Sequence, residues 1–126
     1  MNDMGGRKKI LIVDDDQNIR EFLGNLLNTL GYETIEEGNP LSVVRTIKKE
    51  NPHLMTLDLK MPGANGLQII NTLKREGIKM PIVVLSGYLD QDNTRMLIDL
   101  GVTHIISKPF KSSVLAQHID AALQNK

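Results

Sequence analysis

The sequence contains no cysteine and no tryptophan, and its acidic and basic residues are equal in number. The lack of cysteine excludes disulfides, zinc–thiolate sites and thiol nucleophiles, and it suits a reducing compartment. A formal net charge of zero gives the surface as a whole no attraction to nucleic acid or to anionic membranes. The three histidines, His53, His104 and His118, do not show the spacing of a metal site.

No apolar run approaches the roughly 20 residues that a transmembrane helix needs, and the start of the chain lacks the apolar stretch of a signal peptide. We therefore expect a cytoplasmic protein that does not bind membranes. The polar, glycine-rich start predicts a flexible tail over residues 1–8. Residues 9–126 predict one domain, long enough to bury roughly two-thirds of the surface that its unfolded chain exposes.

Short aliphatic or β-branched runs alternate with longer amphipathic segments along the chain. This alternation is typical of an α/β fold in which a parallel sheet has helices on both faces. We expect the strands at about residues 10–13, 32–36, 54–57, 82–85 and 104–107, and the helices at about residues 17–30, 40–50, 66–76, 90–100 and 111–124. A loop containing Pro62 and Gly63 is expected after the third strand.

Apolar side chains recur at helical spacing in these segments, which predicts the residues that face the core. In the first two helices they are Ile19, Phe22, Leu23, Leu26, Leu27, Leu30, Leu41, Val44 and Ile47. In the third and fifth helices they are Leu67, Ile70, Leu73, Val114, Leu115, Ile119, Ala122 and Leu123. Asp16, just before the first helix, is better explained as its N-cap than as a site residue.

Polar residues stand where four of the expected strands end. In chain order they are Asp14 with Asp15, Asp58, Ser86 with Gly87, and Lys108. The carboxyl ends of parallel strands lie at one edge of the sheet, and ligands bind in a crevice at that edge where the chain reverses its direction of crossover. We therefore expect these side chains to converge there. A cis peptide bond between Lys108 and Pro109 would turn the lysine toward them.

Three carboxylates that converge repel one another, and a like-charged pair about 4 Å apart costs on the order of 4 kcal/mol at an effective dielectric near 20. A cation with oxygen ligands would relieve this repulsion, and Mg²⁺ suits best because it accepts carboxylates, keeps waters and bridges to phosphate. Lys108 can supply a fixed positive charge. Asp58 would then be a competent nucleophile toward phosphorus, and the Ser86 hydroxyl and the Gly87 N–H could bind phosphoryl oxygens.

Four motifs, ILIVDDD at residues 10–16, LDLKMPGANG at residues 57–66, VLSG at residues 84–87 and KPF at residues 108–110, resemble those of the receiver domains of two-component response regulators, which are CheY-like. The match covers nearly the whole chain from about Lys9. The resemblance implies a flavodoxin-like, doubly wound sheet of five parallel strands in the order 2-1-3-4-5, with five flanking helices.

The resemblance also implies roles for the residues at the strand ends. Asp58 would be the phosphoacceptor, supplied by a sensor histidine kinase or a phosphotransfer protein. Asp15, Asp58 and the backbone carbonyl of Lys60 would ligate Mg²⁺ directly, whereas Asp14 would act mainly through water. Lys108 would pair with the acceptor carboxylate or its phosphoryl group.

Ser86 would be the switch hydroxyl that is drawn toward the phosphoryl group. The fourth helix, fifth strand and fifth helix would form the surface for an output domain or partner, and a homodimer could form on phosphorylation. The family often has an aromatic residue where this chain has Ile105, so activation would be transmitted by backbone and helix shifts instead. Lys60 and Tyr88 flank the expected approach of a hydrolytic water, and we expect them to set the lifetime of the phosphorylated state.

Three other functions compete with this interpretation. A metal-dependent aspartyl-phosphate phosphatase needs a general-acid Asp two residues after the nucleophile, where this chain has Lys60. A flavin-binding module would need a glycine- and hydroxyl-rich phosphate loop after the first strand, where Asp14 to Asp16 would repel phosphate. The third is a docking module of the same fold that works without phosphorylation. The sequence leaves open whether the domain stands alone or is part of a longer regulator. We expect no direct binding of nucleic acid by this domain.

Overall fold

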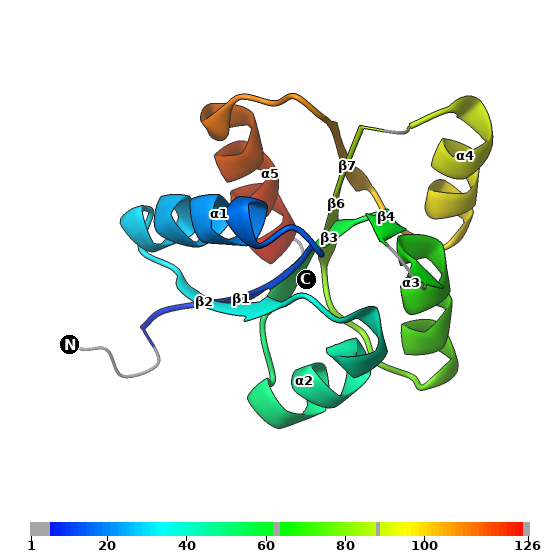
Figure 1. Cartoon of the computed structure of the whole chain (residues 1–126), viewed down its shortest axis with the longest axis horizontal. Coiled ribbons are helices and arrows are strands. Elements are labelled where there is room, and N and C mark those ends of the chain that lie inside the picture. Colours follow the sequence, from blue (N-terminus) through cyan, green and yellow to red (C-terminus); the bar gives the residue numbers. More distant parts are fainter. Residues whose placement is uncertain (1–5, 62–63, 88, 125–126) are drawn as a thin grey trace.

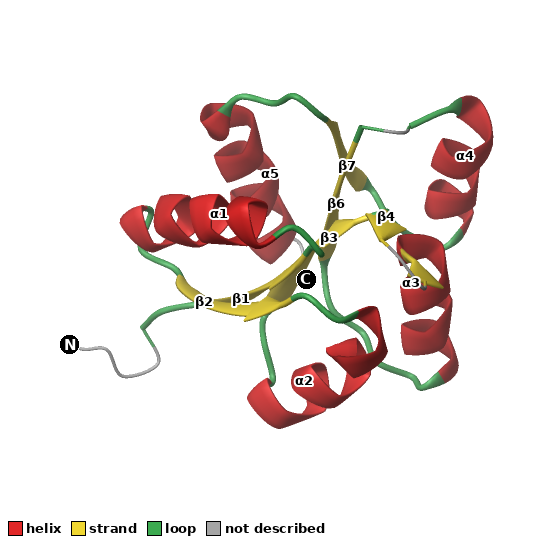
Figure 2. Ribbon diagram, viewed as in Figure 1, coloured by secondary structure: helices red, strands yellow, loops and turns green. Residues whose placement is uncertain are grey.

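The computed structural model of the chain describes residues 6–61, 64–87 and 89–124, without the side chains of residues 60, 61, 64 and 65. Its main sheet has five parallel strands, shown in yellow in Figure 2. They are β1 (Lys9–Val13), β2 (Glu33–Glu37), β3 (Leu54–Asp58), β6 (Ile82–Ser86) and β7 (His104–Ser107). Their order in the sheet, β2-β1-β3-β6-β7, is the expected order 2-1-3-4-5 and confirms the fold class.

Five α-helices cover the two faces of this sheet (Figure 1). One face is covered by α1 (Gln17–Thr29) and α5 (Ser112–Gln124). The opposite face is covered by α2 (Val43–Glu50), α3 (Gly66–Arg75) and α4 (Gln91–Asp99). None of the described helices is long and apolar enough to cross a membrane.

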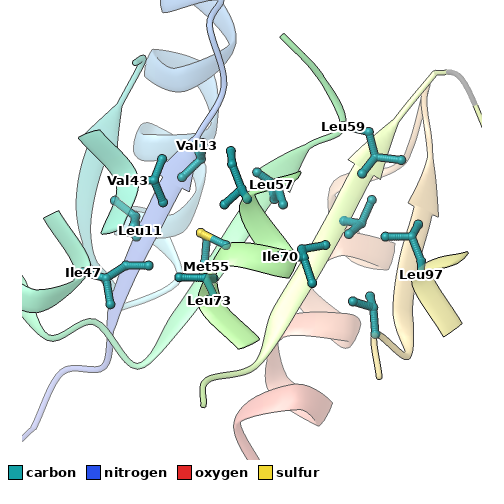
Figure 3. Packing of buried hydrophobic residues seen from close by; sticks show 13 residues of the cluster. Leu11, Val13, Val43, Ile47, Met55, Leu57, Leu59, Ile70, Leu73 and Leu97 are labelled. Atoms are coloured by element: carbon teal, nitrogen blue, oxygen red, sulfur yellow. The ribbon is translucent and has the colours of Figure 1, made fainter. Parts of the chain in front are cut away.

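The strands are apolar throughout because both faces of the sheet are buried. Alternate residues of one strand point to opposite faces, so Leu11 and Val13 pack toward α2 and α3, whereas Ile10 and Ile12 pack toward α1 and α5. Figure 3 shows the first of these clusters, which contains Leu11, Val13, Met55 and Leu57 from the strands together with helix residues such as Ile70 and Leu97. The buried central strands therefore hold the residues at their carboxyl ends in fixed positions.

Local signals in the sequence place the helix ends. The side chain of Asp16 accepts hydrogen bonds from the backbone N–H groups of Asn18 and Ile19, which confirms it as the N-cap of α1. Asp90 caps α4 through a reciprocal pair of hydrogen bonds with Asn93. Gly31 ends the first helical segment at a φ of 97°, a conformation that glycine adopts without strain.

Three residues expected in the core are exposed instead: Phe22 is 56% exposed, Leu30 45% and Leu41 82%. In α1 the buried stripe runs through Leu23 and Leu27, so Phe22 lies beside it and Leu30 lies beyond the last turn. Leu41 is exposed because residues 40–42 form the separate 3₁₀ turn η1 (Pro40–Ser42), so the expected second helix begins only at Val43.

The segment after Asp58 also differs from the expected loop. Two short strands, β4 (Lys60–Met61) and β5 (Ala64–Asn65), pair in antiparallel fashion before α3 begins. Pro62 and Gly63 lie outside the described residues. The chain therefore leaves the sheet through a paired hairpin rather than an open loop.

Candidate functional site

The carboxyl ends of β1 and β3 bring the three expected carboxylates together. The two strands are neighbours in register, with Val13 opposite Leu57, so Asp14 and Asp58 follow at adjacent positions. Asp14, Asp15 and Asp58 each present an oxygen atom, and these atoms all lie within 4.8 Å of one another. The sheet therefore creates an acidic cluster, formed by Asp14, Asp15 and Asp58.

Lys108 places its ammonium group between two members of the acidic cluster. Its Nζ lies 3.6 Å from Oδ2 of Asp14 and 3.7 Å from Oδ2 of Asp58. The three carboxylates and this one ammonium group leave an excess of two negative charges. A divalent cation would neutralise that excess, and the oxygen donors of the cluster are those that Mg²⁺ prefers.

Asp14 is the most deeply buried member, with 2% of its surface exposed. Burial raises the pKa of its carboxyl above the usual value of 3.8, and the charges of Asp58 and Asp15 raise it further. The backbone N–H of Asp16, which donates to Oδ1 at 3.0 Å, and the Lys108 ammonium both act to lower that pKa, but they do not outweigh burial. The cluster therefore holds a negative charge that the protein alone does not fully compensate.

β6 and β7 place the remaining residues expected at this edge. Ser86 is the last residue of β6 and is fully buried, and its carbonyl accepts a hydrogen bond from the Lys108 N–H at 2.9 Å. The peptide bond between Lys108 and Pro109, for which the sequence left both forms open, is cis. Gly87 is exposed, and apart from its chain neighbours no described residue has an atom within 4 Å of the position that a Cβ would take.

Two expected positions lie in part or wholly outside the described residues. Lys60 is described only through its backbone, which pairs with Asn65 in the hairpin. Tyr88 is not among the described residues. Their expected influence on a hydrolytic water therefore stays a prediction.

Arg20 is a residue of this site that the sequence did not indicate. From α1 its Nη1 donates to the carbonyl oxygen of Asp14 at 2.6 Å, and its Nε donates to Oε1 of Glu36 at 3.3 Å. A Cβ on Gly38 would lie only 2.5 Å from Nη1, so the arginine occupies space that any other residue at that position would fill. Arg20 thus holds the backbone that carries the acidic cluster, through a contact that depends on how α1 is rotated.

Gly66 supports the other side of the site. A Cβ on Gly66 would lie 2.9 Å from Cα of Leu59 and 3.1 Å from the carbonyl oxygen of Asp58, and its N–H donates to the Leu59 carbonyl at 2.7 Å. The start of α3 can approach the backbone beside Asp58 only because this residue has no side chain.

Comparisons with known proteins agree with this geometry. The family model described as the response regulator receiver domain matches residues 10–120. The phosphate regulon transcriptional regulatory protein PhoB of Pseudomonas aeruginosa is 34% identical over 119 residues, which make up 93% of this chain and 52% of that protein. The chain thus spans about half the length of that relative.

Two further proteins match the chain over most of their own length. The sporulation initiation phosphotransferase F of Bacillus subtilis is 34% identical over 103 residues, which cover 82% of this chain and 83% of that protein. A crystal structure of a CheY-like receiver domain protein from Methanospirillum hungatei has a TM-score of 0.88 at 26% identity and covers 94% of both chains. The residues that the family model matches, 10–120, include Asp14, Asp15, Asp58 and Lys108.

Proposed function

The chain belongs to the response regulator receiver domain family, and on this premise we propose that Asp58 accepts a phosphoryl group from the phosphohistidine of a sensor histidine kinase or phosphotransfer protein. Receiver domains of two-component systems are phosphoacceptors in phosphorelay signalling rather than turnover enzymes on external substrates. The observation that supports Asp58 is its position at the end of a buried central strand, within 4.8 Å of two other carboxylates and 3.7 Å from an ammonium group.

In the proposed step, a carboxylate oxygen of Asp58 forms a bond to phosphorus while the bond between phosphorus and the histidine nitrogen breaks. The electron pair of the broken bond stays on the imidazole nitrogen. When the other ring nitrogen carries no proton, the departing imidazole takes one up from solvent. Lys108 would offset the charge of the phosphoryl oxygens, and the Ser86 hydroxyl and the Gly87 N–H would donate hydrogen bonds to them. Positioning and charge compensation supply most of the rate in such transfers.

Receiver domains bind Mg²⁺ in an acidic pocket, and we propose that this chain does so through Asp15, Asp58 and the backbone carbonyl of Lys60, with Asp14 acting through water. The donor set supports this assignment, because clustered carboxylates with an uncompensated negative charge match a hard divalent cation. When bound, the ion would allow an anionic phosphoryl group to approach an anionic nucleophile.

The partners are likewise part of the proposal. We infer that α4, β7 and α5 form the surface that binds an output domain or partner protein, that phosphorylation can favour a homodimer, and that the domain contacts neither membrane nor nucleic acid. It would act in the cytoplasm, with residues 9–126 as the receiver domain. The expected N-terminal tail, residues 1–8, lies largely outside the described residues. Like its family, it would catalyse its own phosphorylation and dephosphorylation without turning over an external substrate.

Incubation with acetyl phosphate and Mg²⁺, followed by intact-mass measurement, tests the phosphoacceptor. The wild-type chain should gain the mass of one phosphoryl group, and Asp58→Asn should gain none. Asp16→Asn is the matched control, because it also removes one carboxylate from this edge but keeps an N-cap acceptor for α1, so it should still gain the group. A wild-type chain that stays unmodified would instead favour the phosphorylation-independent docking module.

The lifetime of the modified state is a second measurement on the same sample. We propose that Lys60 and Tyr88 control the approach of the hydrolytic water. Lys60→Ala and Tyr88→Ala should therefore each change the rate at which the phosphoryl mass is lost after acetyl phosphate is removed. Unchanged rates in both variants would show that these side chains only extend into solvent.

A further inference from the structure

Two histidines that lie far apart in the sequence meet between β7 and α5. Nδ1 of His104 and Nδ1 of His118 are 3.1 Å apart, and the two rings are perpendicular with centroids separated by 5.3 Å. The sequence separation of 14 residues gives no hint of this, because the contact depends on α5 packing back over the first residue of the last strand. The pair lies at the amino end of β7 and plays no part in the acidic cluster, which lies at the carboxyl edge of the sheet.

We propose that His104 and His118 form a chelating site for a divalent transition-metal ion of the kind that imidazole binds well, such as Zn²⁺, Ni²⁺ or Cu²⁺. Two nitrogens 3.1 Å apart, each about 2.05 Å from a metal ion, subtend an angle of about 100° at the ion. That angle lies between those of tetrahedral and octahedral coordination. Both rings are only partly buried, which leaves water to fill the remaining positions.

Both donors are held in place before any ion binds. His104 begins β7, two residues before the buried Ile106, and His118 directly precedes Ile119, which is fully buried in the same cluster. The backbone that carries each ring is therefore fixed by the core between the sheet and α5. Binding then costs little conformational entropy, which favours a chelate formed by two ligands from separate elements.

The protonation state of His104 also suits a metal ligand. Burial and the neighbouring His118 lower the pKa of His104, so its ring is neutral at neutral pH. Without a metal, the Nδ1 of one ring donates to the Nδ1 of the other. On binding, the donating ring loses its Nδ1 proton to solvent and gains one at Nε2, which leaves a free lone pair on each Nδ1. A rotation of each ring then turns these lone pairs from the partner nitrogen toward the ion.

This site is separate from the acidic cluster in position and in chemistry. Lys108 follows His104 by four residues, a rise of about 13 Å along a strand, so the histidines lie at the other end of β7. Imidazole binds borderline-soft ions, whereas clustered carboxylates bind Mg²⁺. The inference does not rest on the proposed phosphoryl transfer, and loss of either function would leave the other intact.

Titration of the full chain with Ni²⁺ and with Zn²⁺ at pH 7.5, in the presence of saturating Mg²⁺, tests the proposal by calorimetry and by thermal unfolding. The wild type should bind one ion and unfold at a higher temperature. His104→Gln and His118→Gln should each weaken binding by about tenfold or more, because a single imidazole cannot chelate. His53→Gln is the matched control and should bind as the wild type does, since His53 Nδ1 already accepts the Lys9 N–H at 2.9 Å.

The imidazole ¹⁵N spectrum of the wild type gives a readout that needs no variant to fold. Addition of Zn²⁺ should shift the Nδ1 signals of two histidines together and leave the third unchanged. Both glutamine variants should still gain a phosphoryl group from acetyl phosphate and Mg²⁺, because neither residue belongs to that site. The proposal is overturned if no ion binds, if binding survives both variants, or if the ¹⁵N signals of the pair do not move.

Discussion

Asp14 shows how the burial of a single carboxylate affects the stability of the fold. In the metal-free protein its pKa is raised, chiefly by burial, so the folded chain holds this proton to higher pH than the unfolded chain does. The stabilisation that the protonated group provides is complete below the unfolded value of 3.8 and is lost as the pH rises through the raised folded pKa. Above its raised folded pKa, the ionised Asp14 therefore destabilises the metal-free fold.

Asp14→Asn should accordingly stabilise the metal-free protein by about 1 kcal/mol in urea unfolding at pH 7. The amide oxygen can still accept the Asp16 N–H, while the buried charge and its repulsion with Asp58 disappear. The same variant should lose most of the stabilisation that Mg²⁺ gives to the wild type. A variant that is less stable than the wild type without Mg²⁺ would mean that the ion pair with Lys108 outweighs the cost of burial.

The site residues at the strand ends could be predicted from the sequence, whereas the residues that hold their backbone in place could not. Asp14, Asp58 and Lys108 each follow an apolar run, so the geometry of a parallel sheet is enough to bring them to one edge. Arg20 and Gly38 belong to different segments, and their contact is fixed only by the rotation of α1 against β2. No periodicity in the sequence records that rotation.

At the scale of elements, α1 is tied to the acidic cluster through Arg20. Gly38→Ala would place a Cβ 2.5 Å from Nη1 and force the guanidinium away from the Asp14 carbonyl. We expect this variant to fold but to bind Mg²⁺ about threefold to tenfold more weakly, because a displaced ligand loop loses about 0.7 to 1.4 kcal/mol of preorganisation. A calorimetric titration with Mg²⁺ would measure this affinity directly.

Gly24→Ala in α1 is the matched control for that experiment. Its Cβ would have ordinary contacts, the nearest being 3.7 Å from a carboxylate oxygen of Glu36. Removal of a glycine from a helix interior should stabilise the protein by about 0.5–1 kcal/mol. Mg²⁺ affinity should stay at the wild-type value, so equal weakening in both variants would show that any change near α1 disturbs the site and that Arg20 has no special part.

The strands were the best predicted elements because their apolar runs have no other place in a domain of this size than a sheet buried on both faces. The hairpin of β4 and β5 was missed because two-residue strands are too short to show alternation. Leu41 was misplaced because the apolar spacing cannot distinguish a 3₁₀ turn from the first turn of an α-helix. Tertiary packing, rather than local pattern, decided each of these cases.

At the scale of the whole molecule, the proposed phosphorylation of Asp58 needs a route to the proposed partner surface on α4, β7 and α5. Ile105 stands on the same side as α4 and packs against the cluster that contains Leu97. Its side chain has no ring that could move between buried and exposed positions. We therefore expect the effect of phosphorylation to reach α4 through the backbone. Ser86 ends β6, its carbonyl accepts a hydrogen bond from the Lys108 N–H, and Asp90, the N-cap of α4, follows four residues later in the sequence.

α4 is the helix that is most easily moved by such a route. Leu97 is its one fully buried side chain among the described residues, and Met96 and Ile98 are 53% and 59% exposed. By contrast, α5 buries Leu115, Ile119 and Ala122. Less apolar area is lost when α4 shifts, so we expect that hydrogen bonds donated by the Ser86 hydroxyl and the Gly87 N–H to the oxygens of a phosphoryl group are enough to change its position.

Phosphorylation should therefore slow hydrogen exchange in peptides that cover residues 84–100, because the new contacts hold the segment between β6 and α4. Exchange should not change in β2, the strand at the opposite edge of the sheet from β7, or in α2, the helix that follows it. Exchange mass spectrometry with acetyl phosphate and Mg²⁺ would measure this, with Asp58→Asn as the control that shows no difference. Equal slowing across the whole sheet would indicate that phosphorylation stabilises the domain globally, and a change confined to β3 and α3 would exclude α4 as the element that carries the signal.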